Sequence, residues 1–322
     1  MCIRDSFRSY GWDAANNCHT VYAGRDKGSE LPVVISTWQS LYKMPQKYFE
    51  QYQMVIGDEA HGFKSKSLTS IMTKCINAKY RIGATGTLDG TLTHKLVLEG
   101  LFGKVFKVTS TKKLIDAKHL SPFEINALVL KHPDSICFDL RKSNYQEELE
   151  YLISSKARNV FIKNLVLDLD TNTLLLFRFV EKHGRLLYNM IKEKTDVSNR
   201  KTFFVYGGTD SDTREQIRHI VETEKDSIIV ASYGVFSVGV DIRNLHNIVF
   251  GSPTKSRIRN LQSIGRGLRK SKKKNVATLY DIADDLKHGE RKNYTLGHFE
   301  ERVKIYKEEK FPLHTYHLQL KT

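Results

Sequence analysis

The stretch Gln53-Met54-Val55-Ile56-Gly57, followed at once by Asp58-Glu59-Ala60-His61, joins a short apolar run to an acidic turn. Short apolar runs bounded by polar residues are typical of strands that are buried in a parallel sheet. Similar runs occupy residues 32–36 and 80–84, and a segment of helical spacing extends from Ser67 to Cys75. This alternation of strands with helices predicts an α/β domain whose parallel sheet is covered on both faces.

A second block repeats the pattern further along the chain. Its predicted strands are residues 174–177, 203–206, 228–231, 247–250 and 277–281. A helix through residues 186–191 follows the first of them, and residues 145–165 form another helix, since no Pro or Gly interrupts them. The sequence therefore predicts two doubly wound parallel-sheet domains, the first of them incomplete. We place the first domain at 1–125, a connector at 126–160, the second domain at 161–286 and a helical C-terminal extension at 287–322.

Composition narrows the classes of partner. The 322 residues are enough for two domains, and 51 Lys and Arg against 36 Asp and Glu give a net charge of +15. Such a surplus indicates a polyanionic partner, most commonly nucleic acid. No apolar stretch of about 18 residues occurs, which argues against a membrane partner. Four scattered cysteines without a CxxC pair exclude a zinc ribbon, favour buried thiols and fit a reducing, cytoplasmic setting.

The acidic turn follows a predicted strand, and ligands bind at the carboxyl ends of strands in open parallel sheets. There Asp58 can hold Mg²⁺ through water, and Glu59 can orient and deprotonate an attacking water molecule. A solvated acidic turn is the alternative, and it would be favoured for the Asp-Glu pair alone. The next strand, however, ends in small and hydroxylated residues that include Thr85 and Thr87. These hydroxyls can approach and hydrogen-bond to His61, which favours the functional interpretation.

The second block carries the run Gln262-Ser263-Ile264-Gly265-Arg266-Gly267-Leu268-Arg269. Arg266 and Arg269 are three residues apart and so lie on one face of a helix, with Gln262 one turn earlier. Guanidinium groups suit the charge that develops on a transferred phosphoryl group. The alternative is a basic surface helix, which continues into further lysines.

A loop of small residues follows another predicted strand, from Ala231 to Asp241. Small and hydroxylated residues at such a position, Ser232 among them, expose backbone N–H groups to phosphate oxygens. Gly239 permits close approach of the backbone, and Asp241 can accept a hydrogen bond from a ribose hydroxyl or an arginine. A purely structural turn is the alternative.

Taken in order, these stretches resemble motifs II (58–61), III (84–87), V (231–241) and VI (262–269) of superfamily 2 helicases. The resemblance implies RecA-like domains, ATP and Mg²⁺ as cofactors, and ATP bound between Asp58 and Glu59 on one wall and the two arginines on the other. Residues 34–41 are similar to the family's Thr-x-Gln element, which implies that Thr37 and Gln39 contact the nucleic-acid backbone without reading sequence. Trp38 lies between them, and we interpret it as a core residue rather than a base-stacking one.

Within the superfamily, residues 232–237, 244–246 and 264–270 are similar to the T4-type phage UvsW helicases. This resemblance implies an ATP-dependent DNA helicase or translocase that acts on branched DNA or R-loops, RNA–DNA hybrids included, in phage replication and recombination. The host cytoplasm is then the expected location. Two alternatives stay open: the motor subunit of a restriction or repair complex, and a non-catalytic nucleic-acid-binding remnant.

One expected motif is missing from the 322 residues. The phosphate loop GxxxxGK[ST] should precede the acidic turn, but the glycine pair Gly24 and Gly28 lacks the Gly-Lys-Ser/Thr ending. We therefore expect the chain to start partway through the first motor domain; the resemblance begins near residues 9–12, and whether residues 1–6 are native stays open. Because the loop supplies a lysine for the phosphates and a hydroxyl for Mg²⁺, we also expect this chain to hydrolyse ATP weakly or not at all.

Overall fold

The computed structural model describes residues 3, 7–8, 10–22, 26–86, 88, 91–236, 242–252, 254, 256–270 and 275–321; for residues 236, 257–259 and 266 it describes the backbone alone. The chain divides into two compact units, Met1–Val108 and Thr109–Thr322. Each unit is described below by itself.

The first unit contains two pairs of parallel strands, β1 with β2 and β3 with β4. Its described elements are α2 (Ala14–Asn17), β1 (Cys18–Val21), β2 (Val33–Ser36), α3 (Trp38–Leu41), α4 (Gln46–Phe49), β3 (Met54–Gly57), the 3-10 helix η1 (Ala60–Lys64), α5 (Lys66–Lys74), β4 (Tyr80–Gly83) and α6 (Leu92–Phe102). The three predicted strands and the predicted helix at 67–75 are confirmed. Strand β1 was not predicted, because its four residues include a His and a Thr and show no apolar run.

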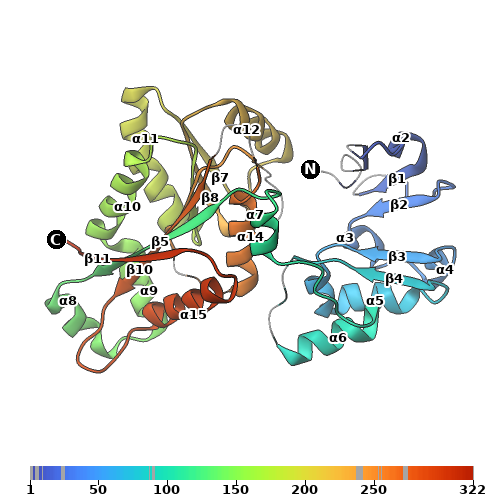
Figure 1. Cartoon of the computed structure of the whole chain (residues 1–322), viewed down its shortest axis with the longest axis horizontal. Helices are drawn as coiled ribbons and strands as arrows, with labels where there is room; N and C mark the ends of the chain where they lie inside the picture. The colour runs from blue at the N-terminus through green and yellow to red at the C-terminus, as the bar shows by residue number, and fades with distance from the viewer. Residues whose placement is uncertain are drawn as a thin grey trace. The chain divides into compact units, whose positions relative to one another are not determined.

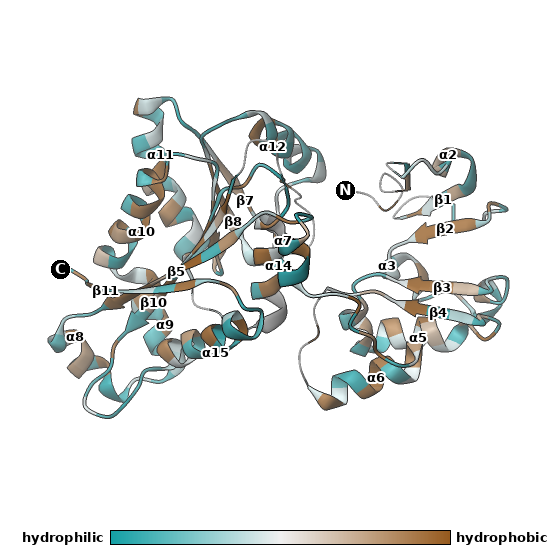
Figure 2. Ribbon diagram, in the orientation of Figure 1, coloured by the Kyte–Doolittle hydropathy of each residue, from teal (hydrophilic) through white to brown (hydrophobic). Residues whose placement is uncertain are grey.

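The β3–β4 pair is covered on one face only. Side chains alternate between the two faces of a strand, so Val55 points to the face that packs against Leu68 of α5. The opposite face carries two cross-strand pairs, Met54 with Tyr80 and Ile56 with Ile82. These four side chains are 46%, 65%, 61% and 48% exposed, respectively. Figure 2 shows apolar residues along both strands. The described residues of this unit therefore leave an apolar sheet face uncovered.

The second unit is built on one seven-stranded sheet of order β11-β5-β10-β9-β6-β8-β7, in which every neighbouring pair is parallel (Figure 1). Its strands are β5 (Phe123–Lys131), β6 (Thr173–Phe177), β7 (Lys201–Val205), β8 (Ser227–Ser232), β9 (Asn247–Phe250), β10 (Ala277–Asp285) and β11 (Leu313–Gln319). The helices are α7 (Thr111–Asp116), α8 (Asp134–Asp139), η2 (Leu140–Lys142), α9 (Tyr145–Ser154), α10 (Lys156–Asp168), the π-helix η3 (Val180–Gly184), α11 (Arg185–Ser198), α12 (Ser211–Thr223), α13 (Tyr233–Phe236), α14 (Arg257–Gly267) and α15 (Tyr294–Glu308).

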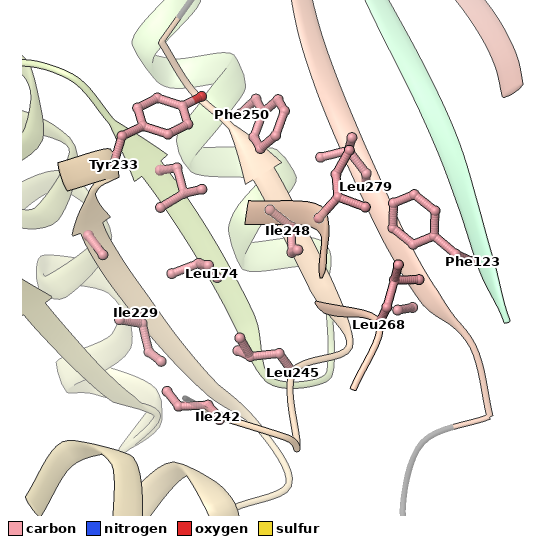
Figure 3. Packing of buried hydrophobic residues seen from close by; sticks show 14 of the residues in the cluster. Phe123, Leu174, Ile229, Tyr233, Ile242, Leu245, Ile248, Phe250, Leu268 and Leu279 are labelled. Atoms are coloured by element: carbon pink, nitrogen blue, oxygen red, sulfur yellow. The ribbon is translucent and has the colours of Figure 1, made fainter. Parts of the chain in front are cut away.

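Alternation along the strands builds an apolar core on each face of this sheet. On one face Leu174 and Ile248 pack with residues of α12, α14 and α15, as the close view in Figure 3 shows for the strand residues. On the other face Leu175 and Phe177 pack against α10 and α11. Helices on both faces of a parallel sheet define a doubly wound α/β fold, so the predicted fold class is confirmed.

Two segments of the second unit differ from the sequence-based expectation. Residues 126–160 were expected to form a connector, but β5 is a strand of the sheet between β11 and β10. Its side chains are largely buried on both faces, as a strand inside a parallel sheet requires. The C-terminal extension at 287–322 was expected to be helical. It contains α15, but β11 then pairs with β5, and Phe311 packs edge-on against Phe123 at 4.9 Å.

The helix predicted at 145–165 is two helices. α9 ends at Ser154 and α10 begins at Lys156, because Ser155 takes an extended conformation and its hydroxyl accepts a hydrogen bond from the backbone N–H of Arg158. Serine is strongly preferred at the start of a helix, so Ser155 was the available signal for the break. Cys18, Cys75 and Cys137 are buried, as predicted; Cys2 lies outside the described residues.

Candidate functional site

The acidic turn follows β3 directly and is held by its own backbone. Oδ1 of Asp58 accepts a hydrogen bond from the backbone N–H of Glu59 at 2.8 Å. Glu59 adopts a left-handed conformation, with φ 48° and ψ 50°. This conformation is uncommon for a residue with a Cβ atom and is typical of functional turns. It turns the chain so that η1 can begin at Ala60.

His61 links the acidic turn to the end of β4. Its Nδ1 lies 3.2 Å from Oε2 of Glu59 and 3.0 Å from Oγ1 of Thr85. A carboxylate can only accept, so the nearby Glu59 favours the tautomer with the proton on Nδ1. The backbone reinforces the link, since Ala60 N–H donates to the carbonyl of Ala84 at 2.9 Å. The structure thus brings together Glu59, His61 and Thr85, three of the residues singled out from the sequence.

Glycine is required where the two strands end. A Cβ atom at Gly57 would lie 2.8 Å from the ring of Phe63 and 2.9 Å from that of Phe102. At Gly83 it would lie 3.0 Å from Phe102. Phe63 and Phe102 also pack edge-on at 5.0 Å, so the acidic turn rests on a pair of aromatic rings. Sequence reasoning missed these two phenylalanines; the glycine at the end of each strand was the available signal.

The predicted nucleic-acid contacts of the first unit are accessible. Thr37 and Gln39 are both exposed, and Oγ1 of Thr37 lies 3.1 Å from Oγ of Ser40. Trp38 is 41% exposed and packs edge-on against Tyr42, at 5.8 Å between ring centroids. The interpretation of Trp38 as a core residue is therefore wrong, because α3 is a single turn that packs only part of this ring.

In the second unit the predicted arginine motif lies on and just after α14. Gln262 is half-buried on the helix, Arg266 lies one turn later, and Arg269 follows the helix end. Burial lowers the pKa of the Arg269 guanidinium from its ordinary value, although arginine remains charged in proteins. A Cβ atom at Gly267 would lie 2.5 Å from Ile248, so this glycine allows α14 to approach β9 closely.

The remaining predicted site residues are either buried or outside the described residues. Ser232 ends β8 and is only 8% exposed, so its side chain is buried rather than presented to a ligand. Thr87, Gly239 and Asp241 lie outside the described residues.

Sequence reasoning missed a buried polar network at the carboxyl end of β10. Arg158 Nε donates to both carboxylate oxygens of Asp284, at 2.8 and 3.0 Å, and Nε2 of His132 lies 3.1 Å from Oδ1. All three side chains are inaccessible to solvent. Burial disfavours the charged carboxylate, but Arg158 and His132 outweigh it and lower the pKa of Asp284 to about 2. An aspartate interrupting the apolar strand was the one visible signal.

A neighbouring buried histidine is neutral. Nε2 of His183 lies 3.0 Å from Oδ1 of Asn159, whose amide nitrogen is committed to the carbonyl of Ile153 at 2.9 Å. The proton therefore sits on Nε2, and Nδ1 accepts from the hydroxyl of Ser252 at 3.0 Å. Burial and the nearby Arg158 lower the pKa of His183 to about 3. This group ties α10, η3 and the end of β9 together.

The donor set of the acidic turn fits a hydrated Mg²⁺ in part. Mg²⁺ retains most of its waters and binds through one or two carboxylates plus substrate phosphates. Asp58 is exposed and uses Oδ1 for the turn, which leaves Oδ2 to face a hydrated cation. Among the described residues no group of three or more His, Cys, Asp or Glu could hold a metal by itself. In the same part of the chain, no helix has the length and apolarity that crossing a bilayer demands.

Comparison with known proteins places these features in a family. Residues 2–90 match the family "Type III restriction enzyme, res subunit", and residues 156–271 match "Helicase conserved C-terminal domain". The ATP-dependent DNA helicase uvsW of Enterobacteria phage T4 is 35% identical over 88% of this chain and 58% of its own length. The chain thus spans little more than half of that relative.

Solved structures show a similarity to the same kind of protein. The crystal structure of T4 UvsW has a TM-score of 0.55 at 32% identity, covering 99% of this chain and 65% of that one. The Type ISP restriction-modification enzyme LlaBIII bound to DNA has a TM-score of 0.60 at 15% identity, covering 90% of this chain and 24% of that one, which speaks for the fold alone. Sequence identity, the two family matches and the RecA-like sheet point the same way: the chain belongs to helicase superfamily 2.

Proposed function

We propose that this chain is the motor part of an ATP-dependent DNA helicase or translocase that acts on branched DNA or R-loops in phage replication and recombination. The observation that carries the proposal is the turn at Asp58–His61, tied to Thr85 at the end of the neighbouring strand. The similarity to uvsW of phage T4 supports the substrate class. DNA is bound through its backbone, as the net charge of +15 and the exposed Thr37 and Gln39 favour.

In this proposal each charged group has one role in ATP hydrolysis. Asp58 would hold a hydrated Mg²⁺, which would supply positive charge beside the phosphates of the substrate. Glu59 orients the attacking water and takes its proton, and His61 holds the Glu59 carboxylate in place from 3.2 Å. Arg266 and Arg269 stabilise the charge that develops on the transferred phosphoryl group, with Gln262 beside them.

The phosphate loop limits what these 322 residues do by themselves. No GxxxxGK[ST] run occurs among them, and the lysine and hydroxyl of that loop hold the phosphates and Mg²⁺. We therefore expect DNA-stimulated ATP hydrolysis by this chain to be weak. Hydrolysis at a rate ordinary for a motor, on the order of 1 per second or more, would contradict this part of the proposal.

The roles are tested in a protein that carries a GKS or GKT motif ahead of the acidic turn. There Glu59→Gln should abolish hydrolysis and leave nucleotide binding intact, because the amide keeps the shape of the side chain but cannot take a proton. Glu30→Gln, an exposed glutamate of the same unit, is the matched control and should hydrolyse ATP normally. Retained hydrolysis in Glu59→Gln would refute the assigned role.

A second candidate is the motor subunit of a restriction complex. The match of residues 2–90 to a restriction-enzyme family favours it. A strand-displacement assay separates the two functions: a helicase separates a forked duplex, whereas a restriction motor translocates on duplex DNA and displaces a bound triplex strand without separating the fork.

A further inference from the structure

The carboxyl edge of the second unit's sheet carries a surface whose residues lie outside motifs II, III, V and VI. Three of the chain segments that leave the parallel sheet at this edge, after β5, β6 and β10, form the surface, and Figure 1 shows α8, α9 and the loop into α15 at this end. We define the aromatic–arginine surface by six residues of these segments, namely Phe138, Arg141, Tyr145, Arg178, Arg291 and Tyr294. We propose that this surface binds single-stranded nucleic acid, with bases stacked on its rings and phosphates on its guanidinium groups.

The six residues form one connected surface. Arg141 stacks on the ring of Phe138 at 3.6 Å, and Tyr145 packs edge-on against Tyr294 at 6.2 Å. Arg291 joins the two pairs, since its Nη2 donates to the carbonyl of Ser143, between Arg141 and Tyr145. The contacts therefore bring together residues that are up to 156 positions apart in the sequence.

The hydrogen bonds of the three guanidinium groups do not neutralise their positive charge. Arg178 donates to the hydroxyl of Tyr145 at 2.8 Å, Arg141 to the carbonyl of Phe138 at 2.6 Å, and Arg291 to a carbonyl as well. Each of these acceptors is neutral. Within the described part of the chain, none of the three arginines forms an ion pair with a carboxylate. Three arginines held in place without a countercharge suit an anion whose charges are spaced along a chain.

The rings identify the kind of anion. Phe138 is 49% exposed and Tyr294 is 46% exposed, although both are large enough to be buried favourably. An acidic peptide would require the arginines but not the exposed rings. Single-stranded nucleic acid requires both, because stacking on aromatic side chains and phosphate contacts together supply its affinity.

The surface is rigid beneath Tyr294. The carboxylate of Glu148, 1% exposed, accepts hydrogen bonds from Tyr294 N–H at 2.9 Å, Thr295 N–H at 2.7 Å and the amide of Asn293 at 3.0 Å. Asn293 in turn accepts from the N–H of Leu286 at 3.0 Å, which closes the loop after β10. A ring fixed by such buried bonds loses little conformational freedom when a base stacks on it.

The inference rests on the proposed function only for the class of ligand, nucleic acid, and its test needs no ATP. The probe is a fluorescein-labelled oligothymidylate, titrated with the full chain and followed by anisotropy at several salt concentrations. The triple variant Arg141→Gln, Arg178→Gln and Arg291→Gln should reduce the slope of log K against log salt by about 2, since each single-strand phosphate contact contributes about 0.7. Tyr294→Ala should weaken binding about tenfold at an unchanged slope, and Tyr294→Phe should bind as the parent does.

A matched control removes the same charge elsewhere in the same unit. Lys113, Lys118 and Lys225 are exposed and precede strands, away from the carboxyl edge, and their triple Gln variant should keep the parent slope. Far-UV circular dichroism and thermal unfolding verify that every variant is folded. Equal losses in the two triple variants, or parent-like binding by Tyr294→Ala, would overturn the inference. The titration contains no ATP, so a failure of the proposed hydrolysis leaves this result interpretable.

Discussion

Replacing Arg158 by Met should lower the free energy of unfolding of the second unit and reverse the sign of part of its pH dependence. Arg158 is fully buried, and its Nε holds both oxygens of Asp284 while Nη1 donates to the carbonyl of Gly251 at 3.0 Å. Methionine is close enough in volume to limit the cavity, so the main effect is a buried carboxylate that has lost its cation. Breaking a buried pair in this way costs about 3–5 kcal/mol.

The pKa of Asp284 gives an independent estimate of the magnitude. It is lowered from 3.8 to about 2, which corresponds to about 2 kcal/mol of stability. Because the native pKa is the lower one, this stability is present above pH 4 and is lost as the pH falls toward 2. Without Arg158, burial raises the pKa of Asp284 above 3.8 instead. Protonation then relieves the variant, so its deficit relative to the parent should shrink as the pH falls from 7 to 4.

The two units provide an internal control for the measurement. Both tryptophans, Trp12 and Trp38, lie in the first unit, so their fluorescence during urea unfolding reports that unit. Far-UV circular dichroism is dominated by the larger second unit. Arg158→Met should lower the urea midpoint of the circular dichroism transition and leave the midpoint of the tryptophan fluorescence transition unchanged.

Arg185→Met is the matched substitution at an exposed ion pair with Glu181, and it should cost much less than Arg158→Met, because solvent screens the exposed pair. An Arg158→Met deficit no larger than that of Arg185→Met, or one that grows toward acid pH, would refute the reasoning.

Three further outcomes follow from buried groups. Because the native pKa of His183 is about 3, only unfolded molecules take up a proton at this residue between pH 6.5 and pH 3. The free energy of unfolding should therefore fall by up to about 1.4 kcal/mol for each unit by which the pH is lowered in this range. Urea unfolding at several pH values should show that His183→Gln removes this component of the pH dependence. Gly184→Ala should lower the free energy of unfolding by about 1–3 kcal/mol in thermal unfolding, since the new Cβ would lie 2.5 Å from the ring of Phe177. Gly297→Ala, in open space on α15, should be neutral or stabilising, and equal effects of the two substitutions would contradict the packing argument. Glu148→Gln places donors against donors, so amide hydrogen exchange at residues 293–295 should accelerate, and unchanged protection would show that the carboxylate does not hold this turn.

Much of the fold could be predicted because the strands of a parallel sheet are marked locally. A run such as Leu174-Leu175-Leu176-Phe177 is apolar at every position, which identifies a strand that is buried on both faces. β11 gives no such signal, since it lies at the sheet edge with most of its side chains exposed. The expected connector begins inside β5, and only the pairing of β5 with β10 and β11 reveals that it belongs to the sheet.

The candidate site also combines contacts that the sequence could predict with contacts that it could not. His61 and Thr85 could be expected to meet because each follows one of two predicted strands, and the carboxyl ends of parallel strands share an edge. The contact of Arg158 with Asp284 spans 126 positions, and no spacing or periodicity connects them. The aromatic–arginine surface was missed for this reason too, because its segments meet only once the sheet has ordered them.

The uncovered face of the β3–β4 pair has a practical consequence for anyone who purifies this chain. Met54, Ile56, Tyr80 and Ile82 present apolar area to water, and among the described residues each strand of the pair has only one neighbour. Flat apolar strands with open edges are templates for pairing with other molecules. The apparent molar mass from light scattering should therefore rise with protein concentration. A lysine at Ile56 should raise solubility more than a lysine at an exposed apolar residue of the second unit such as Val197.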